Sequence, residues 1–128
     1  MGIMKRIMSL GIIMCMLLKV AMAWNLTVGA PNGGWNSKTQ LQAWANSKFI
    51  LVGDNLIFVY EPSEDNVLQV SKEDFYACES KNPIQAHNKS PTAINLPTLG
   101  LIYFISGKPG RCNQGVKVWI NVLKPPLL

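Results

Sequence analysis

The clearest structural signal in the chain is the stretch Leu101-Ile-Tyr-Phe-Ile-Ser-Gly-Lys-Pro-Gly-Arg-Cys-Asn-Gln-Gly-Val-Lys-Val-Trp-Ile-Asn-Val122. In its last seven residues, apolar side chains alternate with Lys117, Trp119 and Asn121, which is the period of a half-buried strand. The first five residues form a second candidate strand, and Gly and Pro lie between the two. The stretch therefore predicts β structure near the end of the chain.

Working outward, the same reasoning predicts four more short strands, at residues 26–28, 56–60, 67–70 and 93–96. Two segments are predicted as short helices, at residues 39–45 and 71–76. The second carries an N-cap signal, because Ser71 is followed three residues later by Asp74. Several short strands separated by turn residues favour an all-β sandwich or barrel with one or two short helices.

The N-terminus is predicted to be a secretory signal peptide of residues 1–23. Lys5 and Arg6 precede an uncharged apolar run of 12 residues, and Ala21-Met-Ala23 supplies the small residues that signal peptidase accepts. The alternative is a membrane anchor, but a spanning helix needs about 20 apolar residues and Lys19 ends this run earlier. We expect cleavage after Ala23.

The remaining residues, 24–128, are predicted to form one small domain. The whole chain has 12 basic and 7 acidic residues, but three of the basic ones fall in the signal peptide. The domain is therefore close to charge balance and has no basic cluster, so nucleic-acid binding is not supported. The tail, residues 124–128, does not have the pattern of a glycolipid anchor signal.

Two cysteines, Cys78 and Cys112, lie outside the signal peptide. An even number of cysteines in a small exported domain predicts one disulfide, which would close a loop of about 35 residues. The alternative is two free buried thiols.

A set of short motifs occurs in order along residues 24–128. They include Val28-Gly-Ala-Pro-Asn-Gly-Gly-Trp35, Trp44-Ala45, Leu56-Ile-Phe-Val-Tyr60, Tyr76-Ala-Cys78, Asn82-Pro83, Tyr103-Phe104, Ser106-Gly-Lys-Pro-Gly110 and Gly115-Val-Lys117. This ordered set resembles the plant phytocyanin family, and within it the early nodulin-like proteins. The resemblance implies a cupredoxin-like Greek-key β-sandwich with a disulfide between Cys78 and Cys112.

The resemblance also places the copper ligands of phytocyanins, and the chain lacks all of them. The two histidine positions carry Asp65 and Arg111, the cysteine position carries Ser106, and the axial position carries Val116. Blue copper is held by two imidazoles and a thiolate, whereas Arg cannot be deprotonated to coordinate a metal. We therefore expect no copper and no other cofactor. We expect Asp65 and Arg111 to form an ion pair instead; the alternative is that both extend into solvent.

No catalytic set emerges from the sequence, so the protein is predicted not to be an enzyme. The only histidine in the sequence is His87, in a polar segment, and no Gly-x-Ser-x-Gly nucleophile motif is present. Carboxylate pairs such as Glu61 with Glu64 and Glu73 with Asp74 are explained more simply as parts of charged turns and helix starts.

The aromatic residues allow two interpretations. Trp35, Trp44, Tyr60, Tyr76 and Tyr103 could form a platform on which carbohydrate stacks, but in a small sandwich most of them are expected to pack in the core. The best candidate for an exposed aromatic is Trp119, unless a helix or loop covers it.

Two N-glycosylation sequons are present, at Asn25 and Asn88. Asn88 lies in a polar, loop-like stretch and is the better acceptor, although a proline follows its sequon.

Taken with the resemblance, these features predict a secreted, copper-free binding protein of the plant apoplast or the outer surface of the plasma membrane. Its expected partner is a cell-wall glycan or a plasma-membrane protein, and its expected role lies in cell-wall organisation or signalling. Electron transfer, by family homology alone, is the alternative function. A third interpretation is that the protein is an inert or degenerate copy of a phytocyanin.

Overall fold

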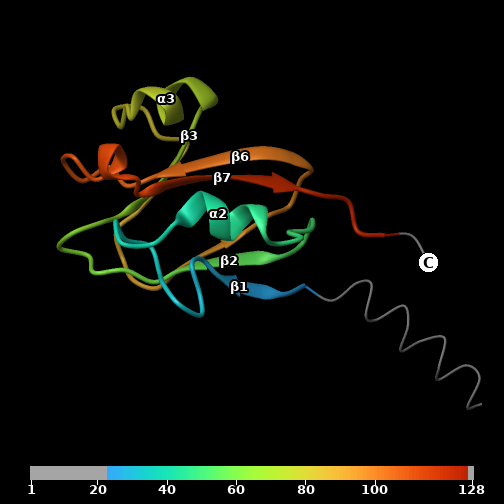
Figure 1. The fold of residues 1–128 in the computed structure, drawn as a ribbon. Helices are drawn as coiled ribbons and strands as arrows, with labels where there is room; N and C mark the ends of the chain where they lie inside the picture. Colours follow the sequence, from blue (N-terminus) through green and yellow to red (C-terminus); the bar gives the residue numbers. More distant parts are fainter. Residues whose placement is uncertain (1–22, 127–128) are drawn as a thin grey trace, which may run out of the picture.

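The computed structural model describes residues 23–126, which fold into two β-sheets and three short helical segments (Figure 1). One sheet has three strands in the order β1-β2-β5, and these are Asn25–Thr27, Asn55–Phe58 and Thr92–Asn95. In it, β1 runs parallel to β2, while β5 is antiparallel to β2. The predicted signal peptide, apart from its last residue, lies outside the described residues.

The second sheet has four antiparallel strands in the order β4-β3-β6-β7. They are Gln85–His87 (β4), Val67–Val70 (β3), Gly100–Ile105 (β6) and Lys117–Val122 (β7). The chain passes from the first sheet to the second after β2, returns for β5, and ends in the second sheet. A bridge between Leu51 and Leu123 joins the segment before β2 to the end of β7.

The core lies between the two sheets, where their inward-facing side chains meet. Phe58 of β2 contacts Trp35 and Phe104 of β6, with ring centroids 5.0 and 5.1 Å away. All three are fully buried, as are Leu56 and Val118. Burying a side chain of this size stabilises a fold by about 1.5–3 kcal/mol, so this cluster is the main apolar contribution to the sandwich.

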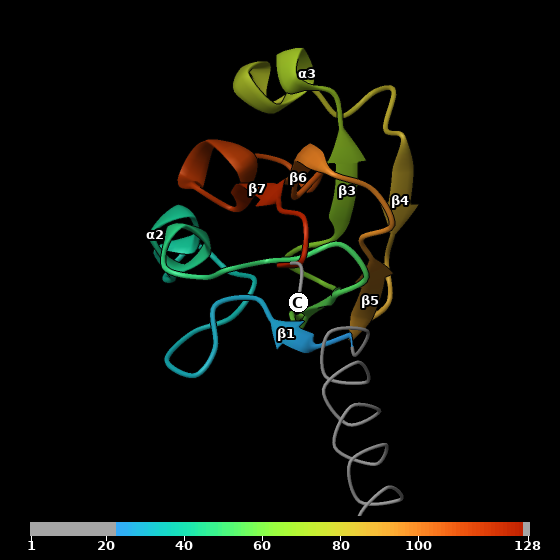
Figure 2. The same ribbon diagram turned by 90° about the vertical axis from the view of Figure 1, so that its right-hand side faces the viewer.

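Two short helices and one 3-10 turn pack beside the second sheet, where one helix contacts the inner strand β6 and the other contacts the edge strand β7 (Figures 1 and 2). Helix α2, Leu41–Asn46, packs against β7, and η1, Cys112–Gln114, precedes that strand. Helix α3, Lys72–Ala77, follows β3 directly. It begins at Ser71, whose Oγ accepts a hydrogen bond of 3.2 Å from the Asp74 amide, as the capping signal predicted.

The predicted β-sandwich with two short helices is confirmed, and six of its seven strands overlap predicted segments. The strand that the sequence did not predict is β4, which has only three residues, polar on average, at the edge of its sheet. Its structure comes from pairing with β3, a tertiary contact that leaves no periodicity in so short a segment. Within residues 23–126, no helix has the length and apolar character needed to cross a membrane.

Candidate functional site

The ion pair expected between Asp65 and Arg111 is present, and it is largely buried. Arg111 Nε and Nη2 donate to the two carboxylate oxygens of Asp65, each at 2.9 Å. Asp65 is 1% exposed and the Arg111 side chain 19%. Such a two-bond arrangement fixes both distance and orientation, so the guanidinium and the carboxylate form one rigid unit.

Backbone contacts bring the other two vacated ligand positions to the same place. Ser106, just after β6, is buried, and its Oγ accepts a hydrogen bond of 3.3 Å from the Asn66 amide. Its own amide donates to the Val116 carbonyl at 2.9 Å, and the Val116 amide donates to the Arg111 carbonyl at 3.1 Å. The turn after β2 and the segments before and after η1 therefore gather Asp65, Ser106, Arg111 and Val116 into one cluster, which we call the ligand-position cluster.

The electrostatics of this cluster favour a charged guanidinium. The hydrogen bond to Asp65 is the largest influence and raises the pKa of Arg111 above its ordinary value, although burial opposes the shift. A raised pKa means that the guanidinium stays charged, and keeps this stabilisation, until pH rises through the folded-state value. The pair is therefore expected to hold throughout the neutral range. Glu64 lies 3.9 Å from Nη2 and is mostly exposed, so it adds little.

Asn66, to which the sequence analysis assigned no role, connects the cluster to the core. Its carbonyl accepts a hydrogen bond of 2.8 Å from Nε1 of the buried Trp35. Its Oδ1 accepts another of 2.6 Å from the Gly107 amide. A Cβ at Gly107 would meet the end of the buried Leu68 side chain, which would have to shift to make room for it. These contacts position the turn that carries Asp65, and they are formed by side-chain and backbone groups that no local pattern marks.

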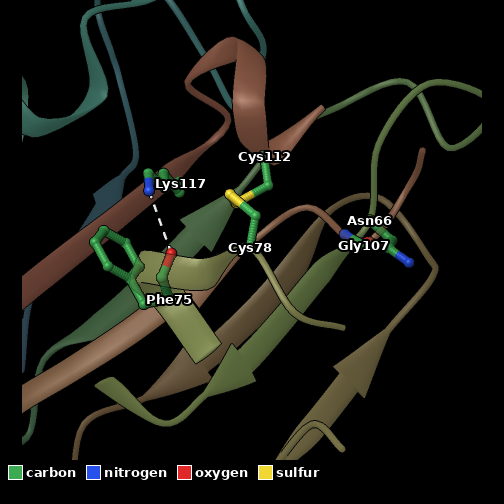
Figure 3. The surroundings of a disulfide bond; sticks show 6 residues. All are labelled: Asn66, Phe75, Cys78, Gly107, Cys112 and Lys117. Atoms are coloured by element: carbon green, nitrogen blue, oxygen red, sulfur yellow. Dashed lines mark hydrogen bonds between the residues drawn. A yellow bond between two sulfur atoms is a disulfide. The ribbon is translucent and has the colours of Figure 1, made fainter. Parts of the chain in front are cut away.

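The disulfide between Cys78 and Cys112 is present beside the cluster (Figure 3). It joins the end of α3 to η1, with the two Cα atoms 5.7 Å apart, and so anchors the residue next to Arg111. On the same side of the molecule, Lys117 Nζ donates to the Phe75 carbonyl at 3.2 Å and lies 4.6 Å from the centre of the Phe75 ring. Both contacts tie α3 to the rest of the domain.

The side chains of the ligand-position cluster do not fit a blue-copper centre. They offer no thiolate and no imidazole, and the one carboxylate, Asp65, is already bound to Arg111 through both oxygens. His87 lies on β4, where its Nε2 is 3.3 Å from Oε1 of Gln85. Across residues 23–126, no three His, Cys, Asp or Glu side chains are grouped so as to hold a metal ion.

Most of the aromatic residues considered for carbohydrate stacking belong to the core. Trp35, Tyr60 and Tyr103 are 0, 8 and 9% exposed, whereas Tyr76 is 63% exposed. Trp119 is half-buried, because α2 lies against its strand. Gln42 of α2 binds the backbone of Trp119 through both groups of its amide, at 3.0 Å each. A five-residue platform is therefore absent from the structure, and only part of the aromatic set remains at the surface.

Trp119 lies between two hollows, each with a volume of about 390 Å³. The first is lined by Tyr76 together with polar side chains from α2 and η1. The second is lined by Phe49, which is 85% exposed, and by Lys48 and Asn121. No carboxylate side chain lines either hollow. We call the two hollows together the α2 groove; it was not predicted, because it is formed by segments far apart in the sequence.

Both sequon asparagines are exposed, as an acceptor must be. Asn25 lies on β1, and its Oδ1 accepts a hydrogen bond of 3.1 Å from Asn55. Asn88 follows β4, and its Oδ1 accepts one of 3.3 Å from Asn66. The attachment atom of each side chain therefore has no hydrogen bond to another described residue.

Known proteins similar to this chain include a family model and several curated plant proteins. The family model described as the plastocyanin-like domain matches residues 35–116. Early nodulin-like protein 14 of Arabidopsis thaliana is 35% identical over 113 residues, which cover 85% of this chain and 62% of that protein. Early nodulin-like protein 12 is 36% identical over 77% of this chain and 54% of its own length. The chain thus spans little more than half the length of these relatives.

Two solved structures are similar to the whole domain. Cucumber basic protein, a blue copper protein, has a TM-score of 0.69 and 33% identity, covering 77% of this chain and 99% of that one. Cucumber stellacyanin also has a TM-score of 0.69, with 29% identity over 82% of this chain and all of that one. The expected cupredoxin-like fold is thereby confirmed.

Proposed function

The chain belongs to the plastocyanin-like family, with early nodulin-like proteins as relatives, and on that premise we propose that it is a secreted, non-enzymatic protein that works without a type 1 copper site. The observation that carries the proposal is the two-bond ion pair between Asp65 and Arg111 at the expected ligand positions. This pair satisfies the buried carboxylate internally and leaves it no free oxygen to offer a metal.

Copper binding would require two unfavourable changes at once. The Asp65–Arg111 pair would have to open, which leaves a charge buried without its partner. The hydroxyl of Ser106, which accepts a bond from the Asn66 amide, would also have to replace a thiolate. An electron-transfer role would therefore need a metal site elsewhere. Among residues 23–126, no group of three His, Cys, Asp or Glu side chains could hold a metal ion.

We place the binding role of the protein at the α2 groove, with an extracellular glycan as its partner. Exposed aromatic faces such as Tyr76 and Phe49 stack against sugar rings, while amide side chains bond to sugar hydroxyls. Lys48 and Lys117 line the groove and no carboxylate side chain lines it, which favours a glycan that carries negative charge. A plasma-membrane protein is the competing partner.

The test is a binding experiment on the secreted protein with matched groove and control variants. Phe49→Ala and Tyr76→Ala remove exposed groove aromatics, whereas Ile84→Ala and Leu99→Ala remove exposed apolar side chains elsewhere. We expect wild-type protein and both controls to bind a uronate oligosaccharide on a glycan array, and both groove variants to lose at least about tenfold in affinity. Retention by plasma-membrane extract alone, or equal binding by all variants, would contradict this assignment.

A further inference from the structure

A second buried carboxylate, Asp54, lies directly before β2 and is 3% exposed. Its Oδ1 accepts a hydrogen bond of 3.0 Å from the backbone nitrogen of Trp24. Its Oδ2 accepts one of 2.9 Å from the amide of Leu51. The carboxylate therefore faces two backbone nitrogens from two different segments.

The backbone around Asp54 holds Trp24 in place. The Asn55 amide donates to the Trp24 carbonyl at 2.8 Å, where β1 begins to pair with β2. The Asp54 carbonyl accepts a bond of 2.9 Å from the Leu96 amide. The nitrogen of Trp24 is therefore brought to the carboxylate by strand pairing rather than by its own side chain, which is 66% exposed.

The charge of Asp54 is not balanced by any side chain that the structure describes. Among residues 23–126, every ion pair involves Arg111, whose partners Glu64 and Asp65 follow the far end of β2. A buried carboxylate is usually accompanied by a cation, because burying a single charge is costly. Two neutral amide donors satisfy its hydrogen bonding but not its charge.

We propose that Asp54 is the binding site for the α-ammonium group of the processed chain, formed when cleavage after Ala23 makes Trp24 the first residue. This inference rests on the proposed secretion of the protein. In the cleavage, water adds across the Ala23–Trp24 amide bond, whose carbonyl carbon takes the hydroxyl while the Trp24 nitrogen takes the hydrogen. The resulting amine is mostly protonated at neutral pH. The hydrogen bond then becomes an ion pair between the same two atoms.

Two independent observations meet at this one bond. The residues Ala21-Met-Ala23 mark the cleavage point from the sequence alone. Asp54 marks the same nitrogen from the folded structure. A cut one residue earlier or later would move the charge by about 3.8 Å, the spacing of consecutive Cα atoms, and out of hydrogen-bond reach. Processing at this bond is therefore expected to stabilise the folded domain.

The test compares full chains expressed through a secretory host at fixed neutral pH. One is the natural sequence, and the other has Gly-Ser inserted between Ala23 and Trp24, so that the mature protein keeps Trp24 as an internal amide. Mass spectrometry should show that the natural protein begins at Trp24. We expect its melting temperature to exceed that of the extended protein by about 4–8 °C, the shift that a stabilisation of about 1 kcal/mol gives in a domain of this size.

The same pair in an Asp54→Asn background is the matched control. There the insertion should change the melting temperature by less than about 1 °C, because the carboxylate is gone. If Asp54→Asn does not fold, the fallback measurement is the rate at which the N-terminal amine reacts with an acylating reagent. The Trp24 amine of the natural protein should react severalfold more slowly than the exposed N-terminal amine of the extended protein. Export with a different first residue, or equal melting of natural and extended proteins, overturns this inference alone. Failure of export overturns the proposed secretion as well.

Discussion

The two buried carboxylates of the domain flank strand β2 and are satisfied in different ways. Asp65, in the turn after the strand, is bound by the guanidinium of Arg111. Asp54, directly before the strand, is bound by two backbone nitrogens. The first arrangement requires a particular side chain in the sequence. The second requires only that strand pairing bring a backbone nitrogen to the carboxylate, so it is set by topology rather than by a residue type.

The largest expected effect on stability comes from the disulfide between Cys78 and Cys112, which lies next to Arg111. Cys112→Ser opens a loop closed across a separation of 34 residues and is expected to lower the free energy of unfolding by about 4 kcal/mol. Denaturant unfolding of the secreted protein measures this loss. Cys78→Ser should give the same loss, and the double variant should add little to it. A loss below about 1 kcal/mol would show that the bond does not constrain the fold.

Removal of the guanidinium is the next largest effect. Arg111→Ala leaves Asp65 buried without a cation, so the free energy of unfolding should fall by about 3 kcal/mol. Arg111→Lys keeps the charge but loses the two-bond geometry. Its free energy of unfolding should be lower than that of the natural protein by about 1–2 kcal/mol. The coupling measured with Asp65→Ala in a double-mutant cycle isolates the pair. Additive losses would show that the two side chains do not interact.

A smaller effect is expected at Asp54, where the partners are backbone groups. Asp54→Asn retains an acceptor for one nitrogen but turns an amide N–H toward the other, leaving an unsatisfied buried donor. We expect a loss of about 2 kcal/mol in denaturant unfolding. Asn121→Ala, which removes an exposed polar side chain from β7, serves as the control. Equal losses for the two variants would remove any special role of the carboxylate.

The smallest expected effect on stability is that of Glu64, whose charge lies near the Asp65–Arg111 pair without close contact to it. Glu64 approaches Arg111 only to 3.9 Å and is mostly exposed. Glu64→Gln should therefore change the free energy of unfolding by less than about 0.5 kcal/mol. A change comparable to that of Arg111→Ala, measured under the same conditions, would mean that Asp65 is not the main partner.

The same contrast explains how much could be predicted from the sequence. The strands came from alternation, as in β7, because inward and outward side chains repeat every two residues. The Asp65–Arg111 pair followed from the family resemblance, since both residues occupy positions that converge on a metal in copper-binding relatives. The same resemblance includes Asp54 and Asn66 among its matching residues but assigned neither of them a role, and nothing in the sequence predicted the α2 groove. The contacts of all three depend on segments that meet only after folding.

The ligand-position cluster holds an ion pair at the positions where copper-binding relatives hold blue copper. The most direct measurement is titration of the secreted protein with Cu(II) while the visible spectrum is recorded. A variant that carries Asp65→His, Ser106→Cys, Arg111→His and Val116→Met restores the ligand types and serves as the positive control. We expect the intense copper–thiolate band in that variant and no such band in the natural protein. An intense band in the natural protein would show that the Asp65–Arg111 pair does not exclude blue copper.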